Sequence, residues 1–150
     1  MKTRRLGKTD LQVSEIGFGG EWLERHPEEE SIELIHYASS KGINILDCWM
    51  ADPKSRDIIG KGIKDNRSQW FIQGHIGSTW KDEQYFRTRD MKYVRPAFED
   101  LLKRLQTDYI DLGMIHYVDS EEEWEQIQHS DYLDYIMELK DKGVIRHIGM

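Results

Sequence analysis

Short apolar runs alternate with amphipathic segments along the chain, and polar stretches that contain Gly or Pro lie between them. The apolar runs are predicted strands, and the amphipathic segments, with apolar residues at helical spacing, are predicted helices. Before the first of these units, two short extended pieces flank a turn that contains Gly7 and Thr9-Asp10. Such residues favour tight reversals, so the pattern predicts a leading β-hairpin.

The pattern predicts five strands and four helices after this hairpin. The strands are expected at residues 15–20, 43–49, 70–77, 109–118 and 144–150. The helices are expected near residues 28–41, 54–64, 90–105 and 132–142. Asp90 is the expected N-cap of the third helix, and Gly42 and Gly143 end the first and the last. Residues 78–90 are expected to form a polar loop.

Alternating strands and helices imply parallel pairing through right-handed crossovers, so the fold class is α/β. The pattern alone does not choose between an open, doubly wound sheet and a closed barrel. No strand is followed by a G-x-G-x-x-G or G-x-x-x-x-G-K-[ST] loop, which many open nucleotide-binding sheets carry. This difference favours the barrel.

Composition narrows the function classes. The 150 residues suffice for one domain, expected to span 1–150, and the net charge of -7 argues against nucleic acid or an anionic membrane as a partner. The single cysteine, Cys48, excludes an internal disulfide, and the first residues lack the apolar run of a secretory signal. The mean hydropathy is -0.73, and no apolar stretch is long enough to span a membrane. We expect a soluble, cytoplasmic protein.

Three titratable residues lie at the carboxyl ends of predicted strands, where sites form in parallel α/β folds. They are Asp47, His75 and His116. Each has an ordinary alternative: a helix cap for the aspartate, and a satisfied core residue for either histidine. Together they favour a pocket. With Asp47 or Asp52, the two histidines also match a metal site of two histidines and one carboxylate, which is one further hypothesis.

Several segments resemble the aldo-keto reductase family in the right order. They are RRLGKTDLQVSEIGFGG, GINILDCWMADPKSRDIIGKGI, YIDLGMIH and LKDKGVIRHIGM. DCWMADP and QGHIGSTW look closer to a divergent bacterial subgroup that often carries a C-terminal ferredoxin-like iron–sulfur segment, which this sequence lacks. The resemblance implies a (β/α)₈ TIM barrel, NADPH as cofactor, and hydride transfer between a nicotinamide and a small-molecule carbonyl or alcohol.

The resemblance also implies site residues. The family sets an Asp, a Tyr, a Lys and a His around the reacting oxygen. Asp47 and His116 match the Asp and the His, whereas Asp52 stands at the position of the Tyr and His75 at that of the Lys. Gly20 and Asp47 are the cofactor-binding residues that the match implies. We therefore predict four catalytic positions, two of them with altered groups.

The two exchanges alter the proton chemistry. An ionised Asp52 accepts a proton but does not donate one, and it would repel the oxyanion that develops as hydride adds. His116 is one alternative donor, and His75 held as imidazolium by Asp47 is the other, because histidine titrates near neutral pH.

The predicted elements make the amino-terminal half of a barrel, and five strands do not close an eight-stranded one. We expect either a fragment of a longer chain or two copies that pair through the exposed sheet edges as a homodimer. The alternative to an oxidoreductase is an inactive barrel remnant that serves as a binding or assembly module.

Overall fold

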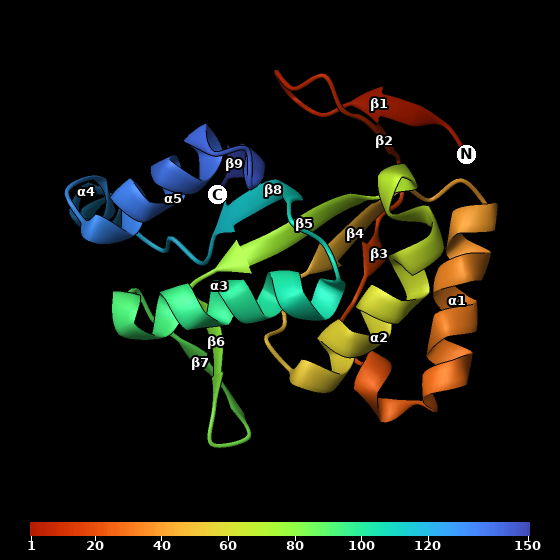
Figure 1. Ribbon diagram of the computed structural model, residues 1–150. Helices are drawn as coiled ribbons and strands as arrows, with labels where there is room; N and C mark the ends of the chain where they lie inside the picture. Colours follow the sequence, from red (N-terminus) through yellow and green to blue (C-terminus); the bar gives the residue numbers. More distant parts are fainter.

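The computed structural model describes residues 1–150 and has a five-stranded parallel sheet at its centre (Figure 1). The spatial order of the strands is β3-β4-β5-β8-β9. Their bounds are Phe18–Gly19, Ile45–Cys48, Phe71–Ile76, Ile110–Ile115 and Ile145–Gly149. All five lie inside the predicted ranges, so the α/β prediction and the parallel pairing are confirmed. Only β3 is much shorter than expected.

Five helices pack against this sheet, one more than predicted. They are α1 (Glu28–Ser40), α2 (Pro53–Ile63), α3 (Met91–Leu105), α4 (Glu121–Gln128) and α5 (Asp131–Asp141), with the short 3-10 helices η1 (Leu23–Arg25) and η2 (Lys64–Gln69). The additional helix is α4, which forms in the acidic stretch before the last predicted helix. The Ser120 side chain accepts a hydrogen bond from the Glu123 N–H, and three glutamates in the first turn favour the positive end of the helix dipole.

One apolar cluster of 23 buried residues lies between the sheet and the helices. Its strand members include Leu46 and Ile72, and α3 contributes Val94, Phe98 and Leu101 at the helical spacing that the sequence shows. Because successive strand residues face opposite sides, Asp47 and Gln73 point to the other face of the sheet. The helices therefore cover one face, and the polar strand residues lie on the opposite one.

Two β-hairpins belong to opposite ends of the sheet (Figure 1). The first, β1 (Thr3–Arg5) with β2 (Gln12–Ser14), confirms the predicted leading hairpin and packs Leu11 and Val13 on Leu112. The second, β6 (Ser78–Lys81) with β7 (Gln84–Arg87), follows the carboxyl end of β5 directly. It corrects the prediction of a loop over residues 78–90.

The sheet also carries the only thiol of the chain, on the helix side of β4. Cys48 is 2% exposed, and burial raises its thiol pKa to about 11. The nearby guanidinium of Arg56 is also buried; it donates to the Ala97 carbonyl oxygen over 3.0 Å and to the Asp100 carboxylate over 3.2 Å. These bonds join α2 to α3.

Every helix of the chain is too short or too polar to cross a lipid bilayer.

Candidate active site

The carboxyl ends of β4, β5 and β8 bring three of the predicted site residues together. His75 on β5 and His116 just after β8 approach through their Nδ1 atoms at 2.9 Å, which is a hydrogen bond. Asp47 on β4 lies with its Oδ1 atom 3.2 Å from His75 Nε2. These three residues form a continuous polar row across adjacent strands, as expected from their places at the strand ends.

The outer end of this row has an unsatisfied acceptor. Asp47 Oδ1 is buried and makes no hydrogen bond, despite its closeness to the His75 ring. The Gln73 side-chain nitrogen, 3.2 Å away, occupies the hydrogen-bonding position at His75 Nε2 instead. A buried carboxylate oxygen without a partner is costly, and such atoms occur where a ligand or a proton completes the site.

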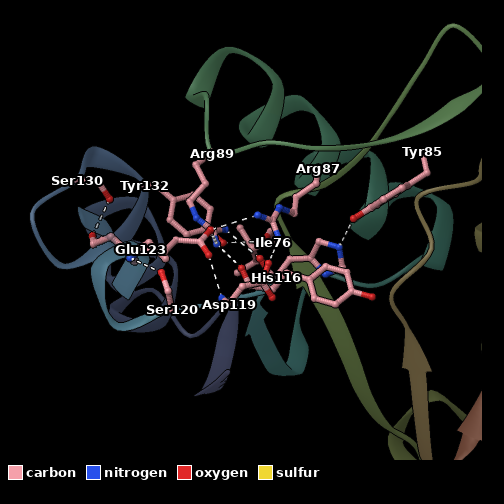
Figure 2. Close-up of polar contacts among 12 residues, drawn as sticks. Ile76, Tyr85, Arg87, Arg89, His116, Asp119, Ser120, Glu123, Ser130 and Tyr132 are labelled. Atoms are coloured by element: carbon pink, nitrogen blue, oxygen red, sulfur yellow. Dashed lines mark hydrogen bonds and ion pairs between the residues drawn. The ribbon is translucent and has the colours of Figure 1, made fainter. Parts of the chain in front are cut away.

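A tyrosine that the sequence did not reveal completes the other end of the row. The hydroxyl of Tyr85, on β7, lies 2.6 Å from His116 Nε2 (Figure 2). Trp49 packs edge-on against the Tyr85 ring, at 5.4 Å between centroids, and stacks on the His116 ring at 6.0 Å. Its indole N–H donates to Glu21 over 3.1 Å. The indole therefore holds both rings in place.

The surroundings of His116 keep its ring neutral. The residue is 2% exposed, and its pKa falls from 6.5 to about 4. Burial is the main cause; the positive charges of His75, Arg87 and Arg89 add to it, and the Asp47 carboxylate opposes it. At neutral pH His116 thus has one N–H donor and one acceptor nitrogen. As a proton donor, His116 therefore offers the single N–H of a neutral imidazole.

Arginines fasten the second hairpin beside His116 (Figure 2). Arg87 donates to Asp119 over 2.7 Å, and Arg89 donates to Glu123 of α4 over 2.7 Å. Arg89 also donates to the backbone oxygens of His116 and Tyr117. These bonds tie the base of the hairpin to the segment after β8, so the Tyr85 strand is held against the site.

Asp52 lies outside the row. Its carboxylate accepts a hydrogen bond from the Ser55 N–H over 2.7 Å and caps α2, with Pro53 in the first turn. A helix cap was the alternative role for Asp47, but the residue that caps a helix here is Asp52. Whether Asp52 also acts in catalysis stays a prediction.

Gly20 follows β3 and lies against the backbone of Asp47. Its N–H donates to the Asp47 carbonyl oxygen over 2.9 Å. A Cβ atom here would lie 2.8 Å from that oxygen and 2.7 Å from a methyl carbon of Ile59. The close approach requires glycine and fixes the backbone that carries the Asp47 side chain. A direct contact of Gly20 with a cofactor stays a prediction.

The histidines do not form a metal centre. No group of three or more His, Cys, Asp or Glu side chains is arranged to hold a metal ion. The two rings instead share a hydrogen bond through their Nδ1 atoms, and their Nε2 atoms contact the Gln73 amide nitrogen and the Tyr85 hydroxyl. The structure therefore gives no support to the metal hypothesis.

The parallel sheet, with polar side chains where its strands end, defines one half of an α/β barrel whose site lies at the carboxyl face. The sequence model of the "Aldo/keto reductase family" matches residues 15–150. The chain belongs to the aldo/keto reductase family.

Named relatives agree with this assignment. The chain is 33% identical to the aldo-keto reductase YhdN of Bacillus subtilis over its full length, and this covers 46% of that protein. It superposes with a TM-score of 0.80 on the holo form of aldo-keto reductase AKR11C1 from Bacillus halodurans, at 30% identity, covering 99% of this chain and 49% of the other. An aldo-keto reductase from Klebsiella pneumoniae in complex with NADPH shares the fold, with a TM-score of 0.75 and 21% identity over 99% of this chain and 48% of that one. The chain spans about half the length of these relatives.

Proposed function

We propose that the protein is a carbonyl reductase or alcohol dehydrogenase that uses NADPH, with its chemistry at the carboxyl ends of β4, β5 and β8. The row from Asp47 through His75 to His116 carries this proposal, because it sits where barrel enzymes place catalytic groups. Membership in an oxidoreductase family supports it. A small-molecule carbonyl or alcohol is the proposed substrate class.

The residues present fit a nicotinamide cofactor. Asp47 Oδ1 is a buried acceptor without a partner, and it faces the same side of the sheet as the histidines. Gly20 lies against the Asp47 backbone, and a Cβ atom here would meet Ile59 on the helix side of the sheet, so Gly20 acts through its backbone. Asp47 and Gly20 are thus the residues proposed to hold the nicotinamide end, and the complex of the Klebsiella relative favours NADPH.

The reduced nicotinamide, when bound, supplies a hydride to the carbonyl carbon, and the carbonyl oxygen must then receive a proton. His75 and His116 replace the lysine-assisted tyrosine of the family as the groups beside this oxygen. Asp47 stabilises positive charge on His75 across 3.2 Å. Asp52 acts here as a positioning residue: its cap fixes the start of α2 and the loop before it, which contains Trp49.

Binding and turnover of NADPH test this function. We expect nicotinamide fluorescence to change on addition of the protein, and NADPH to be consumed with a panel of aldehydes and ketones. Asp47→Asn is expected to lower turnover by about 100-fold, since the charge that supports His75 is removed. The matched control is Asp65→Asn in η2, which is remote from the site. A protein that binds no NADPH and reduces no carbonyl contradicts the proposal.

A second candidate, an assembly module, rests on the sheet edges. In this chain β3 pairs only with β4, and β9 pairs only with β8, so both outer strands have unpaired backbone groups. A second copy that pairs with these edges is the proposed homodimer. Light scattering gives the mass in solution, and thermal unfolding is compared with and without NADPH. A dimer stabilised by NADPH supports two copies that complete one site, whereas a dimer indifferent to NADPH supports the module.

A further inference from the structure

We propose that Tyr85, on the second hairpin, is the proton donor to the carbonyl oxygen, and that His116 and His75 resupply its proton. This inference rests on the proposed function and assigns the acid that Asp52 does not provide. Two hydrogen bonds carry it: Tyr85 Oη to His116 Nε2 at 2.6 Å, and His116 Nδ1 to His75 Nδ1 at 2.9 Å. Asp47 Oδ1 lies 3.2 Å from His75 Nε2 without a hydrogen bond to it. The hydrogen bonds link a phenol to two imidazoles, and a carboxylate lies beside the second of these rings.

The hydrogen bonds of this row allow a proton to move toward Tyr85 in one tautomer of the two rings. His116 has one donor and one acceptor nitrogen, so a proton received at Nδ1 from His75 leaves Nε2–H to donate to the Tyr85 oxygen. The phenol proton is then free to point at a ligand.

Protons and electrons balance along this path. The hydride arrives at the carbonyl carbon with its electron pair, a C–H bond forms, and the π bond breaks toward oxygen. That oxygen takes the Tyr85 proton, so the carbonyl is reduced to an alcohol while the nicotinamide is oxidised. Tyr85 regains a proton from His116 Nε2, and His116 regains one at Nδ1 from His75. As His75 Nδ1 gives its proton, water supplies one at Nε2 of the same ring, which remains partly exposed.

Packing and ion pairs on both sides of Tyr85 fix its position. Its ring is partly buried against Trp49, which also stacks on His116. Two residues further along the strand, Arg87 bonds Asp119, and Arg89 then bonds Glu123. The hydroxyl is thereby held at hydrogen-bond distance from a buried ring, at the carboxyl face where the site lies.

The charges around the phenol set its pH range. Burial and the neighbouring Tyr117 hydroxyl raise the pKa of Tyr85, and the Arg87 guanidinium partly opposes this. The phenol therefore keeps its proton through neutral pH, and turnover should fall only in the alkaline range as Tyr85 ionises. The groups that face His116 in this row are His75 and Asp47 from the sheet, Arg87 and Tyr85 from the hairpin, Arg89 from the following loop, and the adjacent Tyr117.

Tyr85→Phe tests the assignment, since it removes the hydroxyl and keeps the ring that packs on Trp49. We expect carbonyl reduction to fall by about 100- to 10,000-fold. NADPH affinity, measured by fluorescence, should stay within about twofold of the wild type. The matched control is Tyr93→Phe on α3, which removes a hydroxyl outside the row and is expected to leave turnover unchanged.

Two readouts do not depend on turnover. The imidazole ¹⁵N resonances of His116 should shift in Tyr85→Phe and stay in place in Tyr93→Phe, because only the first variant removes the partner of Nε2. Fluorotyrosine at position 85, a more acidic phenol, should move the alkaline limb of the pH profile to lower pH. This substitution also tests the assignment if the Phe variant folds poorly.

The outcomes separate the two proposals. A wild type that binds NADPH and reduces carbonyls, with Tyr85→Phe active within about threefold, overturns the role of Tyr85 and leaves the proposed function standing. An alkaline limb that does not move with fluorotyrosine overturns it as well. A wild type that neither binds NADPH nor reduces any carbonyl overturns both.

Discussion

The two hairpins of this chain are alike in form and opposite in what holds them. The first, β1–β2, places Leu11 and Val13 against the sheet, and these side chains are 6% and 7% exposed. The second, β6–β7, is held by Arg87 and Arg89 through ion pairs and by Tyr85 through its bond to His116. Apolar burial, together with hydrogen bonds between β2 and Asn44, holds the first hairpin, whereas ion pairs and hydrogen bonds hold the second beside His116.

This difference suits the amino end of the sheet to stability and the carboxyl end to catalysis. Apolar contacts are insensitive to small shifts and to pH, so the amino end of the sheet is suited to holding the fold. Hydrogen bonds fix the position of a donor to within fractions of an ångström, which catalysis requires. We expect substitutions at the first hairpin to change the free energy of unfolding, and substitutions at the second to change turnover.

The largest expected effect is a loss in the free energy of unfolding when His116, at the polar end of the sheet, is protonated in acid. The pKa of His116 falls from 6.5 to about 4 in the folded chain, so the unfolded chain binds a proton that the folded one lacks between these pH values. The contribution of His116 to stability is therefore complete above pH 6.5 and declines as the pH falls toward 4. The loss is on the order of 3 kcal/mol, at about 1.4 kcal/mol for each pKa unit.

Urea unfolding at a series of pH values measures this loss. His116→Gln keeps hydrogen-bonding capacity but does not titrate, and its unfolding free energy should lack this part of the acid dependence. Equal acid dependence in the variant and the wild type would contradict the assigned pKa.

Truncation at the apolar hairpin should have the next largest effect. Leu11→Ala removes buried methyl groups that pack near Val13 and Leu112, and we expect a loss of about 2 kcal/mol in the free energy of unfolding. The control is Leu34→Ala on α1, whose side chain is 51% exposed and whose loss should change stability little. Turnover per folded molecule should not change in either variant. A selective loss of turnover in Leu11→Ala would remove the proposed division between the hairpins.

The smallest expected effects come from paired substitutions in the turns of the two hairpins. Gly7, in the first hairpin, has a φ of +55°, and Glu83, in the second, has a φ of +61° without the freedom of glycine. Gly7→Ala should destabilise the chain by about 1 kcal/mol, and Glu83→Gly should stabilise it by up to about 1 kcal/mol. The shift of the urea midpoint gives both signs. Shifts of the same sign would show that backbone strain does not govern these turns.

The sequence predicted the sheet well because its signals are local. Each strand is a short apolar run, and the helix spacing of Val94, Phe98 and Leu101 marks their burial without any long-range information. The second hairpin has no such signal. Its turn uses Asp82 and Glu83, both at positive φ, where the usual hairpin turn has a glycine, and its strands are largely polar.

The site residues at the ends of the parallel strands could be predicted from the sequence. The site residue on the second hairpin could not. Asp47, His75 and His116 meet because parallel strands bring their carboxyl ends to one edge. Tyr85 meets His116 across 31 residues through the unpredicted hairpin, so no spacing rule indicated it. Asp52 was placed by matching a family motif, and motif spacing does not reveal that a side chain caps its own helix.

The buried thiol of Cys48 is a probe of how often the structure around β4 opens. The residue stands next to Asp47 in β4 but faces the apolar side, and a thiol with a pKa of about 11 reacts only after the surrounding structure opens. Because no other cysteine competes, the labelling rate with a thiol reagent counts openings of one strand. A ligand bound at Asp47 should slow that rate, so protection of a single sulfur atom would report occupancy on the other side of the sheet.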